Sequence, residues 1–194
     1  MNISGEIMSN DTSLANHLLI ATPMQNDPNF PKSVIYVCEH HVRGTVGLVV
    51  NRPMPFSLGL VFDQLQIDPI NLSAKNLPLL FGGPIQPERG FVIHRPLGIW
   101  QSSLSLREGV TVTTSNDIIR AIAQNEGPVD ALVTLGYVAW TDSQLEQEVM
   151  NNKWLVCPYK PEILYEVPFA QRWEYAGSTI GVKMNLLTGE YGHA

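Results

Sequence analysis

Two short apolar runs rich in β-branched residues constrain the fold of this chain most strongly. They span residues 34–38 and 45–50, and the polar segment EHHVRG separates them. Because each run is continuous rather than alternating, both predict strands that are covered on two faces. The separating segment is short enough to join the strands as a hairpin, and Gly44 can take the positive φ angle that such turns often need.

Similar apolar runs predict further strands, each bounded by turn-forming residues. These runs occupy residues 17–21, 79–81, 90–94, 110–114, 130–138 and 154–157. The segments 79–81 and 90–94 are close enough in sequence to pair as a second hairpin. Helical patterns are concentrated after residue 115. They cover residues 116–126, 144–150, 162–166 and 169–176, with one earlier short helix at 60–65.

Early hairpins followed by later helices predict an α+β fold with a mixed, largely antiparallel sheet. The 194 residues fit a single domain spanning 1–194, with loose ends at 1–13 and 186–194. Hydrophobic residues make up 44% of the chain and charged residues 15%. That composition supplies a full core and carries too little charge for a disordered chain.

The charge balance argues against nucleic acid as a partner. The 12 Lys and Arg residues are outnumbered by 18 Asp and Glu residues, which gives a formal net charge of −6 and a poor match to phosphate backbones. The first thirteen residues contain neither Lys nor Arg, so they do not resemble a secretory signal. Since no apolar run approaches the roughly 20 residues needed to cross a bilayer, we expect a cytoplasmic protein without a membrane partner.

Patterns for metal binding and nucleophilic catalysis are weak. Cys38 and Cys157 lie within apolar runs, which favours buried free thiols over a disulfide or a zinc site. His40 and His41 are adjacent and would point to opposite faces of an extended strand, so they do not suit one metal. Neither a nucleophile elbow nor a phosphate-binding loop is present. We therefore predict no metal, no cofactor and no catalytic residue.

Polar residues gather where the apolar runs end, and we name them the strand-end rim. Its members are Asn51, Arg52, Gly82, Gly83, Arg89 and His94. The glycines can offer backbone N–H groups to an anion, the arginines can attract its charge, and Asn51 can orient it. The same residue types are typical of tight turns, which is the alternative interpretation. Secondary candidates are His40, Gly136, Trp140 and Gln144.

Four segments carry a resemblance to a known family. They are LLIATP at 18–23, NFPKSVIYVCEHHVRGTVGLVVNRP at 29–53, FGGPIQPERGFVIHRP at 81–96 and GPVDALVTLGYVAWTDSQLEQEVMNNKW at 127–154. In this order they resemble the YqgE/AlgH family of small bacterial cytosolic proteins, from about residue 14 to 182. The resemblance implies a compact α+β domain whose bent sheet folds partly on itself, with short helices packed against it. It implies no settled activity, although one branch is labelled a transcriptional regulator.

The chain departs from the family pattern at Ala139 and Ser143, where the family usually has glycine. This weakens the case for a ligand that needs bare backbone at that turn. Our first functional hypothesis is a non-enzymatic regulatory or ligand-binding module that uses the strand-end rim for a small anionic ligand or a protein partner. The alternatives are a regulator that binds DNA directly and an enzyme acting on nucleotides or phosphoesters. A strand is predicted between the two clearest helices, which does not match a helix-turn-helix.

Overall fold

A computed structural model describes residues 13–95 and 98–187. Its strands, in chain order, are β1 (His17–Ala21), β2 (Val34–His41), β3 (Gly44–Val49), β4 (Pro53–Ser57), β5 (Pro78–Phe81), β6 (Ile85–Arg95), β7 (Ser103–Ser105), β8 (Thr111–Thr113), β9 (Asp130–Trp140) and β10 (Trp154–Pro158). Its helices are α1 (Leu58–Gln64), α2 (Asn116–Ala123), α3 (Gln144–Met150), α4 (Pro161–Tyr165), α5 (Arg172–Thr179) and α6 (Met184–Leu187). The loose ends predicted for 1–13 and 186–194 lie outside the described residues, apart from Ser13 and the last two residues of α6.

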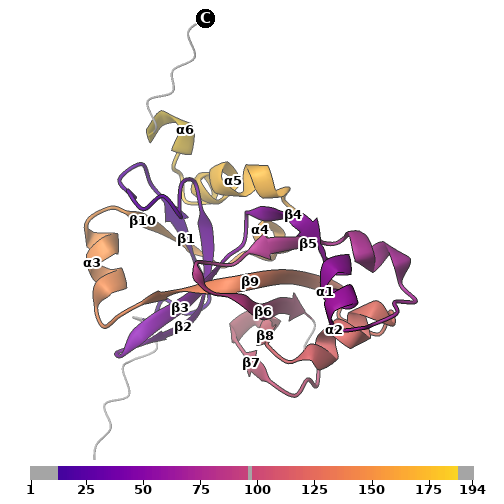
Figure 1. Cartoon of the computed structure of the whole chain (residues 1–194). Coiled ribbons are helices and arrows are strands. Elements are labelled where there is room, and N and C mark those ends of the chain that lie inside the picture. The colour runs from indigo at the N-terminus through magenta and orange to yellow at the C-terminus, as the bar shows by residue number, and fades with distance from the viewer. Residues whose placement is uncertain (1–12, 96–97, 188–194) are drawn as a thin grey trace, which may run out of the picture.

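The strands form one bent sheet in which the long strand β9 is central (Figure 1). The strand order is β10-β1-β2-β3-β9-β6-β8-β7, and β4 joins through β5, which pairs with β9. Among the described strand pairs, only β5 with β9 is parallel. The predicted α+β class with a mixed, largely antiparallel sheet is therefore confirmed.

The first predicted hairpin is confirmed and the second is wrong. Strands β2 and β3 pair antiparallel, with His41 opposite Gly44 at the turn. Strands β5 and β6 instead lie on either side of β9, because Leu135 pairs with Phe81 on one edge and with Gly90 on the other. The residues that connect β5 to β6 must therefore cross β9. The closeness of β5 and β6 in the sequence did not reveal that β9, which follows about fifty residues later, lies between them.

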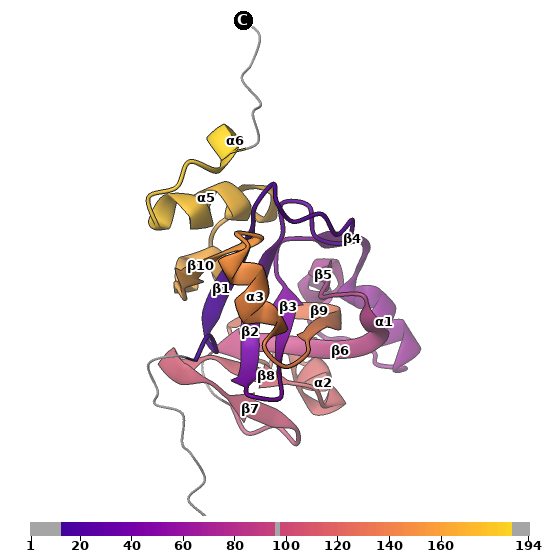
Figure 2. The same cartoon turned by 90° about the vertical axis from the view of Figure 1, so that its left-hand side faces the viewer.

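Helices cover the two ends and one side of the sheet (Figures 1 and 2). Helices α1 and α2 lie at one end, α3 lies at the opposite end, and α5 lies across the side near β1 and β10. Half of a capping box forms at the start of α3, because the Thr141 N–H donates to Gln144 Oε1 at 3.1 Å while Ser143 occupies the N-cap with φ 57°. Strands β4 and β7 were not predicted, since each is short and rich in proline or serine.

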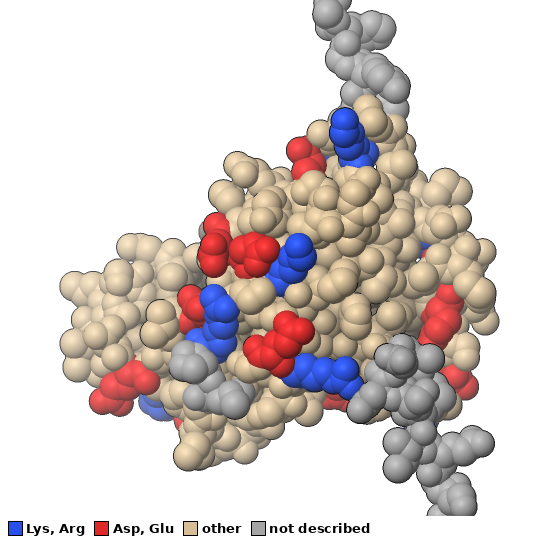
Figure 3. Space-filling view, turned by 180° about the vertical axis from the view of Figure 1, so that it is seen from behind, with Lys and Arg blue, Asp and Glu red and all other residues tan. Residues whose placement is uncertain are grey.

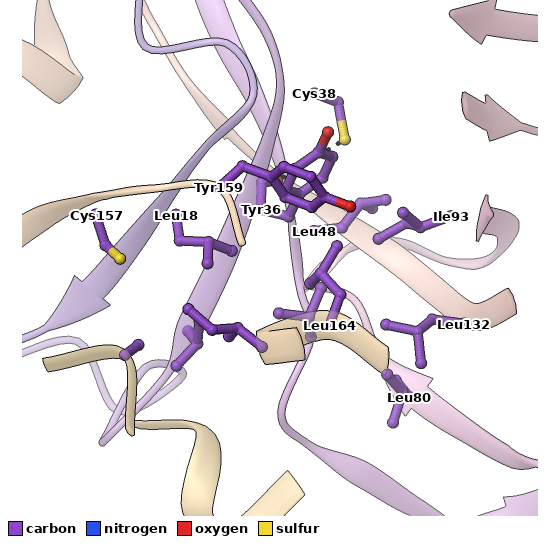
Figure 4. Packing of buried hydrophobic residues seen from close by; sticks show 14 of the residues in the cluster. Leu18, Tyr36, Cys38, Leu48, Leu80, Ile93, Leu132, Cys157, Tyr159 and Leu164 are labelled. Carbon is purple, nitrogen blue, oxygen red and sulfur yellow. Dashed lines mark hydrogen bonds between the residues drawn. The ribbon is translucent and has the colours of Figure 1, made fainter. Parts of the chain in front are cut away.

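Three clusters of buried side chains fill the spaces between the sheet and the helices. In the largest, side chains from β1, β2, β3, β6 and α4 converge, including Leu18, Tyr36, Leu48, Ile93 and Leu164 (Figure 4). A second cluster lies under α1 and α2, and a third lies under α3. Both cysteines are buried and free as predicted, and burial raises the pKa of each thiol. Within the described chain, no helix has the length and apolar character to cross a bilayer.

Candidate functional site

The glycines of the strand-end rim lie where the β5–β6 connection crosses β9. A Cβ atom at Gly82 would come within 2.3 Å of the Gly136 carbonyl oxygen, and one at Gly83 within 2.2 Å of the Tyr137 carbonyl. The Gly82 N–H donates to the Leu135 carbonyl at 2.7 Å, and its own carbonyl accepts from the Val49 N–H at 2.8 Å. Gly82, Gly83 and Gly136 are all buried. These glycines therefore permit backbone to pass over backbone, and the Gly82 amide is already occupied.

Asn51 and Arg52 also engage the backbone of the protein itself. Asn51 Oδ1 accepts from the Val34 N–H at 2.8 Å, and its Nδ2 donates to the Lys32 carbonyl at 2.9 Å. Arg52 donates to the Asn29 carbonyl, and its guanidinium lies 5.7 Å from the centre of the Phe81 ring. Burial lowers the pKa of Arg52. Both side chains connect the loop before β2 to the residues after β3. This is the role in turns that was the alternative interpretation of the strand-end rim.

Arg89 lies in the middle of β6 and His94 lies next to its last residue, and the two differ in exposure. Arg89 is exposed, with its guanidinium 5.2 Å from the centre of the Phe91 ring and its Nη1 donating to Gln86 Oε1 at 3.3 Å. His94 is fully buried, and its Nε2 lies 2.9 Å from Thr113 Oγ1. Of the two arginines of the strand-end rim, Arg89 is thus the more exposed, and Arg52 is half-buried. Arg52 and Arg89 contact different neighbours and share none of the contacts described here.

His40, a secondary candidate, connects the start of the described chain to α3. The Leu14 N–H donates to His40 Nδ1 at 3.0 Å, so that nitrogen carries no proton. The proton is then on Nε2, which donates to Glu146 Oε1 at 2.9 Å. Within residues 13–95 and 98–187, no group of three or more His, Cys, Asp or Glu side chains is placed to hold a metal ion.

Trp140 and Gln144, the remaining secondary candidates, meet at the carboxylate of Glu148. Glu148 Oε2 accepts from Trp140 Nε1 at 3.0 Å and from Trp154 Nε1 at 2.7 Å, while Oε1 accepts from Gln144 Nε2 at 3.0 Å. The two indole rings lie edge to face, with centres 6.0 Å apart. The i, i+4 spacing of Gln144 and Glu148 was visible in the sequence. The convergence with two tryptophans depends on the contacts between α3, β9 and β10.

One hollow lies between α1, α2 and β6, and we name it the α1–α2 hollow. It has a volume of about 550 Å³. Its floor is apolar, with Val92, Ile119 and Val133, and its edge carries the polar side chains of Gln64, Thr114 and Asn116. Gly90 also lines it, and a Cβ atom there would meet nothing within 4 Å. No sequence signal identified this space, because it depends on how two helices sit against the sheet.

A second hollow of about 330 Å³ lies beside Arg89, and we name it the Arg89 hollow. Its apolar residues include Leu48, Phe91 and Val112, and its polar residues include Arg89 and Glu39. Cys38 is at its base but is only 5% exposed, and burial raises the pKa of its thiol. A protonated and shielded thiol is a weak nucleophile. The arrangement is therefore better suited to binding an anion than to covalent chemistry.

The fold is that of a small α+β protein organised around one bent sheet. A family model described as AlgH-like matches residues 18–185. A UPF0301 protein of Legionella pneumophila strain Paris is 67% identical over 183 residues, which cover 94% of this chain and 98% of the relative. A UPF0301 protein of Thioalkalivibrio sulfidiphilus is 45% identical over 187 residues, covering 96% of this chain and all of the relative. The chain belongs to the YqgE/AlgH family, as its motifs predicted.

Solved structures agree with this assignment. The solution structure of the AlgH protein from Pseudomonas aeruginosa is 41% identical, has a TM-score of 0.78 and covers 96% of this chain and 99% of its own. A crystal structure of a Corynebacterium diphtheriae protein is 19% identical with a TM-score of 0.70, covers 89% of this chain and 90% of its own, and shows the shared fold alone. The names of these relatives state no activity, so function has to be argued from the site.

Proposed function

We propose that this protein is a non-enzymatic binding module that holds a small, largely apolar molecule in the α1–α2 hollow. The observation that carries the proposal is the volume of that hollow, about 550 Å³. Sites for small molecules typically occupy 300–1,000 Å³, with mostly apolar walls and a few placed polar groups. The floor of Val92, Ile119 and Val133 and the edge of Gln64, Thr114 and Asn116 match that description.

The charges of the residues around the α1–α2 hollow narrow the class of ligand that it can hold. Among the described residues that line the α1–α2 hollow, Glu88 alone is charged, and it is exposed. At the start of α2, the carboxylate of Asp117 already accepts from the Ile118 N–H at 3.0 Å, which compensates the positive end of the helix dipole. Both observations favour a neutral ligand with hydroxyl or amide groups over an anion. Glu88 faces solvent, so among the described residues that line this hollow there is no buried carboxylate to act as a general base.

Gly90 gives a direct test, because a larger side chain at this position would enter the open space. N-phenyl-1-naphthylamine, a neutral aromatic amine that fluoresces in apolar surroundings, is the probe. We expect one probe molecule to bind per chain, and Gly90→Leu to raise its dissociation constant at least tenfold. Gly90→Ala is the matched control and should stay within about twofold of the wild type, since a methyl group fills little of the hollow.

Amide NMR spectra of the same complexes locate the probe. Binding in the α1–α2 hollow would shift the resonances of Ser115 and Asn116, which line it. Equal affinity of the wild type and Gly90→Leu, or shifts confined to other residues, would contradict the proposal. Urea denaturation of each variant separates a filled hollow from a damaged fold.

A second candidate is the small anionic ligand of the strand-end rim hypothesis, now assigned to the Arg89 hollow. The specific observation is the exposed guanidinium of Arg89 at the edge of that space. Glu39 lines the same hollow and opposes an anion, which is why this candidate comes second. Inorganic phosphate titrated by NMR tests it, with Arg89→Gln as the variant and Arg107→Gln as the control. Binding that survives Arg89→Gln would reject it.

Direct DNA binding, and with it the label of transcriptional regulator, has less support. The Gln124 amide donates to the Asp68 carbonyl at 3.2 Å, and Asn125 accepts from Asn71 at 3.4 Å, so the two amides near the end of α2 are engaged within the protein. On the face seen in Figure 3, basic and acidic side chains alternate without a basic stripe. A mobility shift at low salt tests this function. We also expect the protein to act in the cytoplasm, where two buried free thiols would stay reduced.

A further inference from the structure

A small hollow beside α3, which we name the Glu148 hollow, has a different chemistry from the other two. Its volume is about 160 Å³. It is lined by the rings of Phe30 and Trp140, the carboxylates of Asp27 and Glu148, and the amide of Gln144. Among the described residues that line it, none is a lysine or an arginine. The hollow thus combines aromatic rings with two acidic groups, and none of the described lysines or arginines lines it to balance their charge.

The carboxylate of Glu148 is held in place without being neutralised. Its three side-chain hydrogen-bond donors are the indole N–H groups of Trp140 and Trp154 and the amide of Gln144, and all three are uncharged. In the described part of the chain, no ion pair includes Glu148. A carboxylate offers about four acceptor positions, so one on Oε1 stays available to a ligand. The donors fix the direction in which that position points.

The aromatic rings beside Glu148 are buried and packed against one another. Trp140, Trp154 and Phe30 are 4%, 1% and 7% exposed. Trp154 contacts Phe30 edge to face with ring centres 5.7 Å apart, and it contacts Trp140 at 6.0 Å. A site that is already ordered loses little conformational entropy when a ligand enters.

We propose that the Glu148 hollow binds the ammonium head of a compact organic cation. Aromatic rings attract ammonium groups through their quadrupole, and a half-buried carboxylate attracts the same charge more strongly than one in bulk water. A metal ion is a poor match, because divalent cations prefer several oxygen ligands and the lining also includes Pro84, Ile85 and Val138. The ammonium belongs either to a free amine or to a methylated lysine side chain of a partner protein.

Choline and its neutral analogue 3,3-dimethylbutan-1-ol provide the test, because they have the same shape and differ in charge. Titration of the full chain is followed by the indole N–H resonances of Trp140 and Trp154, with sodium chloride at matched ionic strength as the control. We expect choline to shift both resonances and the alcohol to shift neither. Glu148→Gln, which keeps a carbonyl acceptor, should weaken choline binding at least tenfold, and Asp27→Asn about twofold.

Three outcomes of these titrations would contradict the proposal. Absence of a shift with choline, equal shifts with the alcohol, or unchanged affinity in Glu148→Gln would overturn the proposal. If Glu148→Gln does not fold, the exposed substitution Asp27→Asn and the comparison of choline with the alcohol decide it. A second titration uses N-acetyl-trimethyllysine amide. Tighter binding than choline assigns the site to a partner's side chain, and weaker binding assigns it to a free amine.

Discussion

Two glycines at either end of one short segment, Gly83 and Gly90, have opposite surroundings. A Cβ atom at Gly83 would lie 2.2 Å from the backbone of Tyr137, whereas one at Gly90 would meet nothing within 4 Å. Gly83 belongs to a crossing of two backbones, and Gly90 borders the α1–α2 hollow. The comparison teaches that glycine in a turn-rich motif marks close approach in one place and empty space in another.

The other candidate residues divide in the same way, into a closed side and an open side. Asn51, Arg52 and the glycines of the crossing belong to the closed side, where their polar groups are used within the fold. Gly90, Arg89 and the start of α2 belong to the open side, where groups face hollows. Substitutions at five positions test this division, and they follow in order of expected effect.

Gly83→Ala should have the largest effect, because its methyl group has no room beside Tyr137. We expect a loss of about 3 kcal/mol in the free energy of unfolding, measured by urea denaturation. Gly136→Ala should lose a similar amount, since its Cβ would lie 2.2 Å from the Gly83 carbonyl and its φ of 73° disfavours alanine. A loss under about 0.5 kcal/mol in both variants would show that the crossing can open.

Asn51→Ala should come next, with a loss of about 2 kcal/mol, because the Val34 N–H and the Lys32 carbonyl lose their partners. Asn51→Asp is the matched control, since it keeps the acceptor for Val34 and should lose less. Thermal and urea denaturation both report the change. A fully stable Asn51→Ala variant that no longer binds phosphate would return Asn51 to the role proposed in the strand-end rim.

Asp117→Asn tests the start of α2, where this carboxylate is used within the fold although its neighbours Ser115 and Asn116 line the α1–α2 hollow. Burial alone would raise the pKa of Asp117, but hydrogen bonds from Ser115, Gln101 and Ile118 outweigh it and hold that pKa below its ordinary value of 3.8. A lowered carboxyl pKa stabilises the fold above pH 3.8, and this stabilisation is lost as the pH falls further. We expect Asp117→Asn to cost about 1 kcal/mol at pH 7.

The pH dependence of that difference is the control. Wild type and Asp117→Asn should approach equal stability as the pH falls through the lowered folded-state pKa, because the carboxyl group is then protonated in both folded and unfolded chains. Urea denaturation from pH 2 to pH 7 measures it. A difference that stays constant over this range would mean that the ionised carboxylate is not what stabilises the start of α2.

Gly90→Ala should have the smallest effect and the opposite sign. Glycine within a strand is less stable than alanine by roughly 0.5 kcal/mol, and the new methyl group would enter open space. We therefore expect a slight gain in stability by urea denaturation. A loss above about 1 kcal/mol would mean that the hollow is closed in solution at this position, and would weaken the proposed function as well.

Local sequence patterns predicted the positions of strands and helices better than they predicted which strands pair with each other. The apolar runs at 34–38 and 45–50 formed the expected hairpin, because the signal and the pairing both lie within a few residues. The pairing of 79–81 with 90–94 failed, because Leu135 on a distant strand lies between them. The predicted family was confirmed, since its motifs extend over most of the chain.

Buried polar residues were the least predictable from sequence. Arg172 has the character of an exposed helical residue, yet it is 3% exposed and donates to the carbonyls of Val50, Leu164 and Val167. Burial lowers its pKa to about 10. Its partners come from two separate segments, the end of β3 and the end of α4, so no spacing in the sequence marks it. Glu148 is similar, because its two indole donors lie eight residues before it and six residues after it, on different strands.

The sequence by itself determined the α+β class, most strand and helix positions, the free thiols and the family, because these follow from short-range periodicity, composition and ordered motifs. Only the tertiary structure decided which glycines are crowded, which arginine faces solvent and where the hollows lie. Those properties depend on β9, which brings together segments fifty residues apart, and on the way helices rest on the sheet. No residue type in the sequence marks a hollow, because a hollow forms only from the way several elements pack together.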